Sequence, residues 1–190
     1  AFENGSVAIA YDSRIKSDKF AKEAAAVLAA NGIKVYIYSE LMPTPMLSWA
    51  VRELKCQAGI VITASHNPAK YNGYKVYGED GCQITLDVAN TVIGKINAVE
   101  MFGGAKVVDF EDGIKSGKIE YIKQDVIDKY LDKVAQQGVH TDLVADSGLK
   151  LVYTPLNGTG NKPVRAILKK IGIKEVTVVP EQENPDGTEL

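Results

Sequence analysis

Short apolar runs alternate with longer amphipathic segments along the first half of the chain. Residues 7–11 and 34–39 form two such runs, and residues 58–63 form a third that is apolar on consecutive rather than alternate positions. A consecutive apolar run is typical of a strand that helices cover on both faces. In the intervening segments apolar residues recur every three or four positions, as in an amphipathic helix. The pattern therefore predicts an α/β layer fold with residues 58–63 as a central strand.

Two of the intervening segments carry the start signals of helices. Ser17 is expected to cap the first helix and Thr44 the second, with Pro45 at the first helical position of the second. The first helix is expected to face the sheet with a stripe of four apolar side chains: Phe20, Ala24, Val27 and Leu28.

The middle of the chain continues the same pattern less regularly. We expect a strand at residues 74–77 and two amphipathic helices at residues 86–98 and 124–137. Residues 103–116, rich in glycine and acidic side chains, are expected to link these helices as a solvated loop.

A loss of apolar periodicity at residues 138–148 marks a predicted domain boundary. A strand, a helix and a strand are expected beyond it, as one β-α-β unit at residues 149–154, 161–171 and 174–179. Residues 1–140 are therefore expected to form one domain. Because about 40 residues rarely hold a β-α-β unit together alone, residues 141–190 are interpreted as the incomplete start of a second domain.

Composition and charge narrow the function classes. The 22 basic and 24 acidic residues give a net charge of -2, which indicates neither a nucleic-acid surface nor a polybasic membrane patch. No apolar run approaches the ~18 residues of a membrane span, and no signal-peptide pattern is present. Cys56 and Cys82 match neither a disulfide framework nor a zinc site, so we interpret both as thiols in a reducing cytoplasm.

Polar residues cluster where three predicted strands end. The first strand leads into Asp12, Ser13 and Arg14, the second reaches residues 43–45, and the third reaches residues 63–67. In open α/β sheets ligands gather at this edge. Arg14 is a planar charged donor suited to phosphate, and a lysine at position 75 is a point charge suited to the same group. Cations around Ser65 suggest phosphoryl chemistry.

Other interpretations of Ser65 remain open on the residues alone. A hydrolase nucleophile elbow requires glycines where Thr63 and Asn67 stand, and His66 is a poor base because neighbouring side chains diverge in extended chain. Residues 65–68 also fit a capped turn, and residues 72–73 a hairpin turn. The turn at residues 158–160 fits either an anion site or a plain structural turn. The reaction is undecided at this level.

A longer motif carries a family resemblance. Thr63-Ala64-Ser65-His66-Asn67-Pro68, followed by Tyr71-Asn72-Gly73-Tyr74-Lys75, closely resembles the active-serine loop of the α-D-phosphohexomutases, the phosphoglucomutase and phosphomannomutase superfamily. Residues 11–14 and 43–45 resemble two further stretches of the family's first domain, and residues 154–160 and 182–187 resemble the opening of its second. The resemblance implies a layered α/β/α domain with a mixed, mostly parallel sheet, plus the first β-α-β unit of a second, similar domain.

The resemblance also implies a reaction and a set of site residues. Ser65 would carry a phosphoryl group and exchange it with a hexose phosphate, through a 1,6-bisphosphate, so that glucose 1-phosphate and glucose 6-phosphate interconvert. Arg14 and Lys75 match catalytic basic residues around the phosphate, and together with Ser65, His66 and Asn67 they would bind substrate. Mg²⁺ would be held through the phosphate on Ser65, with its other ligands outside this chain, and glucose 1,6-bisphosphate would be the activator.

The chain also departs from the family pattern. It contains no aspartate-rich D-x-D-x-D loop and none of the later domains. Our hypothesis is an N-terminal fragment of a longer phosphoglucomutase, most similar to the bacterial α-phosphoglucomutases and inactive alone. The alternatives are phosphomannomutase, phosphopentomutase, or a non-catalytic module that binds sugar phosphates.

Overall fold

The computed structural model describes residues 5–188 and contains a five-stranded sheet in the order β4-β3-β1-β2-β5. Strands β1, β2, β3 and β5 run parallel, and β4 pairs antiparallel with β3. The strands are β1 (Ser6–Tyr11), β2 (Lys34–Ile37), β3 (Ala58–Ile62), β4 (Tyr74–Gly78) and β5 (Ile119–Tyr121). The expected mixed, mostly parallel sheet is confirmed, with residues 58–62 in its interior.

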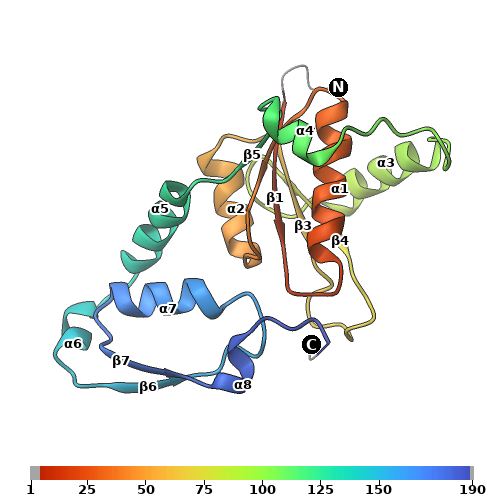
Figure 1. Cartoon of the computed structure of the whole chain (residues 1–190). Coiled ribbons are helices and arrows are strands. Elements are labelled where there is room, and N and C mark those ends of the chain that lie inside the picture. The colour runs from red at the N-terminus through yellow and green to blue at the C-terminus, as the bar shows by residue number, and fades with distance from the viewer. Residues whose placement is uncertain (1–4, 189–190) are drawn as a thin grey trace.

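Helices cover both faces of this sheet (Figure 1). One face carries α1 (Ser17–Ala30) and the short α4 (Phe110–Lys115), and the other carries α2 (Thr44–Glu53) and α5 (Gln124–Ala135). Successive residues of β1 point to opposite faces, so that Ala8 packs toward α2 and Ile9 toward α1. The expected α/β/α layering is therefore present.

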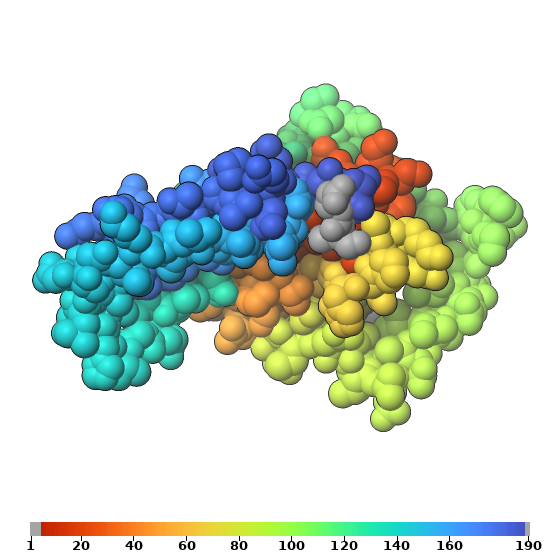
Figure 2. Space-filling model, turned by 90° about the horizontal axis from the view of Figure 1, so that it is seen from below, coloured from red at the N-terminus to blue at the C-terminus, as the bar shows by residue number. Residues whose placement is uncertain are grey.

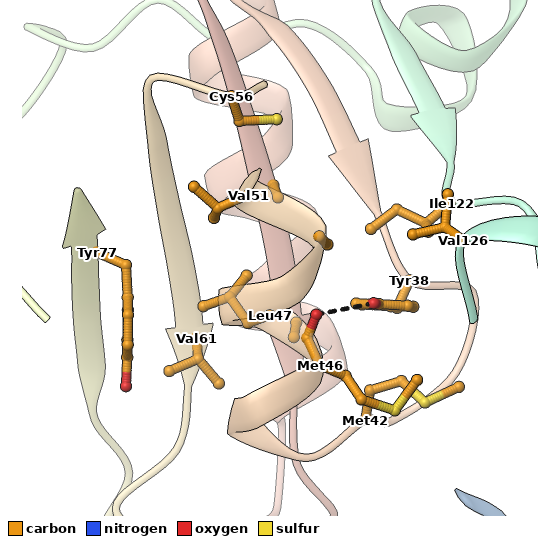
Figure 3. Packing of buried hydrophobic residues seen from close by; sticks show 13 residues of the cluster. Tyr38, Met42, Met46, Leu47, Val51, Cys56, Val61, Tyr77, Ile122 and Val126 are labelled. Carbon is orange, nitrogen blue, oxygen red and sulfur yellow. Dashed lines mark hydrogen bonds between the residues drawn. The ribbon is translucent and has the colours of Figure 1, made fainter. Parts of the chain in front are cut away.

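The layer between the sheet and α2 is tightly packed (Figure 3). Leu47 and Val51 of α2 are fully buried, and a Cβ atom on Gly59 of β3 would lie 2.5 Å from Val51 Cγ2. The hydroxyl of the buried Tyr38 donates a hydrogen bond to the carbonyl of Met46 at 3.0 Å, which satisfies the phenol inside an apolar layer. This packing fixes the end of β3 from which the candidate site begins.

The predicted inward stripe of α1 is wrong at its first residue. Phe20 is 45% exposed, and the fully or almost fully buried face of the helix consists of alanines: Ala21, Ala25, Ala26 and Ala29. Small side chains let the helix backbone approach the sheet, whereas a phenyl ring at that interface would hold it away. All four residues of the predicted stripe line a groove beside Tyr74 of β4, and of these Ala24 and Leu28 also pack against the buried core.

The expected caps of the first two helices are also corrected. Ser17 and Thr44 are the first helical residues rather than the caps, so both helices begin one residue earlier than expected. Lys16 and Pro43 occupy the N-cap positions, and neither helix has a side-chain capping bond. The acidic segment that we expected to be a loop contains α4, whose N-cap Asp109 accepts a hydrogen bond from the Asp112 amide.

The remaining elements lie outside the five-stranded sheet. Helix α3 (Leu86–Asn97) has no buried residue and projects away from the sheet (Figure 1). The C-terminal part contains a parallel pair, β6 (Lys150–Tyr153) and β7 (Glu175–Val178), joined by α7 (Asn161–Lys170) and flanked by α6 (Thr141–Ala145) and α8 (Pro180–Glu183). The expected β-α-β unit is present, and the boundary near residue 140 stays a prediction. Within residues 5–188, no helix combines the length and apolar character needed to cross a bilayer.

Candidate functional site

Ser65 lies just beyond β3, in the connection of residues 63–73 that we term the serine loop. It is exposed and has a φ of 58°, a left-handed conformation that is uncommon for a residue with a side chain. Its backbone amide donates to Thr63 Oγ1 at 2.9 Å. Two further bonds, from the Asn67 amide and Asn67 Nδ2 to the carbonyl of Ala64, close the first turn of the loop.

Arg14 is buried beneath the serine loop and holds its backbone. Only 3% of the residue is exposed, and its two terminal nitrogens donate to four backbone carbonyls of the loop: Ser65, Asn67, Pro68 and Tyr71. Asp12 provides the counter-charge, with its Oδ2 at 3.4 Å from Arg14 Nε, although Nε has no hydrogen bond. The sequence suggested a phosphate-binding arginine, whereas the donors of this side chain point at the loop backbone.

Lys75 lies on β4 directly opposite Val61 of β3, so the two side chains share the α2 face of the sheet. The lysine is half-buried and makes no ion pair within residues 5–188. Its charge is therefore available to an anion on the face where Val61 lines the cleft described below.

The ring of His66 is closer to the serine than the sequence suggested. His66 Nδ1 lies 3.5 Å from Ser65 Oγ, at the outer limit of a hydrogen bond. We expected the two side chains to diverge because we assumed extended chain, and the left-handed Ser65 breaks that assumption. The distance is longer than that of a working nucleophile–base pair.

A cleft of about 270 Å³ opens beside Ser65. It brings together the ends of the three strands that the sequence singled out, and adds two residues of the C-terminal unit: Asp12, Ser13, Met42, Pro43, Thr44, Val61, Thr63, Ser65, His66, Gly158 and Thr159. Arg14, Asn67 and Lys75 are not among the residues that line it. The turn at residues 158–160 thus faces the serine across the cleft.

Gly187 connects the C-terminal unit to this end of the sheet. It is buried, and a Cβ atom there would lie 2.6 Å from the carbonyl oxygen of Ser13 and from the amide nitrogen of Ile15. Figure 2 views this end of the molecule and shows the C-terminal segment (dark blue) beside the serine loop (yellow). No role for Gly187 was predicted from the sequence, although the motif at residues 182–187 could have drawn attention to it.

Two further features describe the chemistry of this region. Burial, with the nearby carboxylate of Asp18 as a smaller cause, raises the pKa of Tyr11 at the end of β1 from 10.0 to about 12. Among the described residues no group of three or more His, Cys, Asp or Glu side chains is placed to hold a metal. Asp12, the carboxylate in the cleft, already accepts bonds from Ser17 and Arg14. These residues do not by themselves form a magnesium site.

Family models match both parts of the chain. Residues 2–102 match phosphoglucomutase/phosphomannomutase alpha/beta/alpha domain I, and residues 128–188 match alpha/beta/alpha domain II of the same family.

Individual proteins agree with the family models. A phosphoglucomutase of Staphylococcus saprophyticus is 36% identical over 185 residues, which cover 97% of this chain and 33% of that protein. A phosphoribomutase of Saccharomyces cerevisiae is 36% identical over 197 residues, covering 94% of this chain and 31% of the yeast protein. The crystal structure of a putative phosphomannomutase from Thermus thermophilus superposes with a TM-score of 0.80 at 27% identity, covering 97% of this chain and 39% of that one. The chain spans about a third of the length of the curated relatives it matches, and it belongs to the phosphoglucomutase/phosphomannomutase family.

Proposed function

We propose that this chain is the phosphoserine-bearing part of a mutase that moves a phosphoryl group between C1 and C6 of glucose phosphate. The observation that carries the proposal is the placement of Ser65. A rigid buried strand ends beside it, a buried arginine holds its loop, and its side chain lines a cleft between two parts of the chain. A serine hydroxyl is a weak nucleophile, so positioning and charge neutralisation have to supply the activation.

In the proposed reaction, the bond between Ser65 Oγ and phosphorus breaks while a sugar hydroxyl forms a new bond to the same phosphorus. The sugar hydroxyl loses its proton, and Ser65 Oγ gains one. The bisphosphate then turns around, and its other phosphoryl group returns to Ser65. Glucose 1,6-bisphosphate would also phosphorylate resting enzyme, which makes it the activator.

We assign different tasks to the cations and polar groups of the site. Lys75, charged and without an ion pair in the described part of the chain, is proposed to neutralise the phosphoryl oxygens. His66 and Asn67 are proposed to bind substrate from the serine loop, and Arg14 is proposed to act mainly by holding that loop. Mg²⁺, with the phosphate on Ser65 as one ligand, would neutralise charge in the transfer; its remaining ligands are proposed to lie outside this chain, and within residues 5–188 no group of three or more His, Cys, Asp or Glu side chains could hold it.

We further propose that residues 1–140 form the first domain of a longer protein and residues 141–190 begin its second. The relatives are about three times as long, and β6 and β7 form a sheet of two strands in which every residue is at least partly exposed. Glucose phosphate is the proposed substrate, with mannose and pentose phosphates as alternatives. Cys56 and Cys82 are both free, which supports a reducing cytoplasmic location.

The test uses the full-length protein that contains this chain. Incubation with glucose 1-phosphate, Mg²⁺ and a trace of glucose 1,6-bisphosphate is expected to form glucose 6-phosphate, and peptide mass spectrometry is expected to find phosphate on Ser65. Ser65→Ala should abolish both, whereas Ser116→Ala, which removes one hydrogen bond in α4, should leave both unchanged. Binding of glucose 1-phosphate without phosphorylation of Ser65 would contradict the mutase and support a binding module. Formation of glucose 6-phosphate by residues 1–190 alone would contradict the need for further domains.

A further inference from the structure

Asp12 is the centre of a hydrogen-bond system that reaches both sides of Ser65. Its Oδ1 accepts a bond of 2.7 Å from the hydroxyl of Ser17 and one of 3.0 Å from the amide of Arg14. Its side chain is 14% exposed, and Ser17 is completely buried. Two separate arms lead from this carboxylate to the serine loop.

The first arm ends at the backbone amide of Ser65. Asn72 Nδ2 donates to Ser17 Oγ at 2.9 Å and to the carbonyl of Ile15, while Asn72 Oδ1 accepts from the amide of Gly73 at 2.8 Å. The carbonyl of Gly73 accepts from the amide of Thr63 at 3.0 Å. Thr63 Oγ1 in turn accepts from the amide of Ser65 at 2.9 Å.

The second arm ends at the carbonyl of the same residue. Arg14, paired with Asp12, donates from one terminal nitrogen to the carbonyl of Ser65 at 2.9 Å. Both backbone polar groups of Ser65 are therefore connected to Asp12, the amide through Ser17 and Asn72, and the carbonyl through Arg14. A closed system of this kind restrains the φ and ψ angles of Ser65 from both sides.

Ser65 needs such restraint because its backbone conformation is unfavourable. A left-handed residue with a side chain costs about 1–2 kcal/mol relative to the right-handed region, so an unrestrained loop would relax. Hydrogen bonds that follow one another in a series strengthen each other, and loss of one partner leaves buried polar groups unpaired. Ser17 and Asn72 are the polar side chains that connect the start of α1 to the end of the serine loop next to β4.

We propose that Asp12, Ser17 and Asn72 are positioning residues that hold Ser65 in its left-handed conformation at the cleft. Ser17 therefore does not act as a helix cap, and Asn72 does not act as a residue of a two-residue hairpin turn, since eleven residues separate β3 from β4. The catalytic consequence rests on the proposed phosphoryl transfer, whereas the conformational consequence does not. The two are therefore tested separately.

The conformational test uses amide hydrogen exchange in residues 1–190. Ser17→Ala and Asn72→Ala are expected to speed exchange of the Thr63 and Ser65 amides by about tenfold, the equivalent of one or two lost hydrogen bonds. Amides inside β1 should exchange as before. Ser116→Ala and Asn31→Ala each remove one side-chain hydrogen bond far from the loop, and they should not change its exchange. Unchanged exchange at the Thr63 and Ser65 amides in both loop variants would overturn the proposal.

The catalytic test uses the full-length protein at a temperature where every variant is folded. Ser17→Ala is expected to lower kcat by about tenfold or more, with KM for glucose 1-phosphate within about threefold, because neither Ser17 nor Asn72 lines the cleft. Ser17→Thr keeps the hydroxyl and should recover most of kcat. Unchanged kcat in the Ser17→Ala enzyme would overturn the catalytic part. An active Ser65→Ala enzyme would instead refute the proposed function. The positioning of Ser65 would then be tested by hydrogen exchange alone.

Discussion

Arg14→Met tests whether Arg14 holds the serine loop or serves only to bind phosphate. Methionine is about as long as the aliphatic part of arginine, so the substitution removes four hydrogen bonds to loop carbonyls with little change in packing. It also leaves Asp12 without its counter-charge in a site where only 14% of the Asp12 side chain is exposed.

The magnitude follows from these contacts. A hydrogen bond from a charged donor contributes about 1.5 kcal/mol net at the low end of its range, so four of them sum to about 6 kcal/mol before other effects are subtracted. Two effects make the loss smaller than this sum. Water can solvate the freed carbonyls in part, and the variant no longer has the free-energy cost of burying a charged guanidinium. We therefore expect the free energy of unfolding of unphosphorylated residues 1–190 to fall by about 2–4 kcal/mol.

Urea denaturation followed by circular dichroism measures this change. Arg14→Lys keeps the charge but cannot span four carbonyls, so it should lose an intermediate amount. Arg52→Met is the control, because Arg52 is exposed and its side chain donates one hydrogen bond in the described part of the chain, to the carbonyl of Ser48 in the same helix; it should change stability by less than about 0.5 kcal/mol. An Arg14→Met protein that is as stable as the wild type without phosphate would refute the loop-holding role. Full recovery by lysine would show that charge alone suffices.

Three further predictions concern the loop, the packing and the effect of pH. Gly73→Ala places a Cβ atom 2.6 Å from the backbone carbonyl oxygen of Thr63, at the other end of the serine loop, and is expected to lower the free energy of unfolding by about 2 kcal/mol. Gly94→Ala in α3 meets nothing within 4 Å and should stabilise by about 0.5–1 kcal/mol; equal effects of the two substitutions would contradict this geometry. Ile9→Ala in the core should cost about 2–5 kcal/mol, whereas Ile96→Ala on α3, 62% exposed, should cost less than about 0.5; a larger loss there would show that α3 packs against another surface. Because burial raises the pKa of Tyr11 to about 12, its contribution to stability is present below about pH 10 and is lost as pH rises through 12. Urea titrations should therefore show a steeper alkaline loss of stability for the wild type than for Tyr11→Phe, and parallel losses would contradict the shift.

Much of the fold followed from the order of residues along the chain. The consecutive apolar run at residues 58–62 identified the central strand because only a strand buried on both faces tolerates it. Parallel strands end at one edge, so Asp12, Thr44 and Ser65 could be expected to meet there, and all three line the cleft. The family motif is a continuous local pattern of side chains, so it too could be recognised from the sequence alone.

Features that depend on contacts with distant segments could not be predicted from the sequence in this way. β5 has three residues, too few to show a period, and it is a strand because it pairs with β2. α1 has apolar residues on two sides, and only contact with the sheet shows that the alanine face is the buried one.

The sequence alone determined that Asp12, Thr44 and Ser65 meet at one edge of the sheet, because each follows the end of a parallel strand. Only the tertiary structure decided what each group does. Arg14 binds backbone carbonyls 51 to 57 residues away. Every residue has such a carbonyl, so the sequence does not show which ones will accept a hydrogen bond. Likewise, the left-handed conformation of Ser65 and the connection from Asp12 through Ser17 to Asn72 exist because distant backbone segments lie within hydrogen-bond distance. Such long-range contacts depend on the packed layers that bring the segments together, and no local pattern of side chains encodes them.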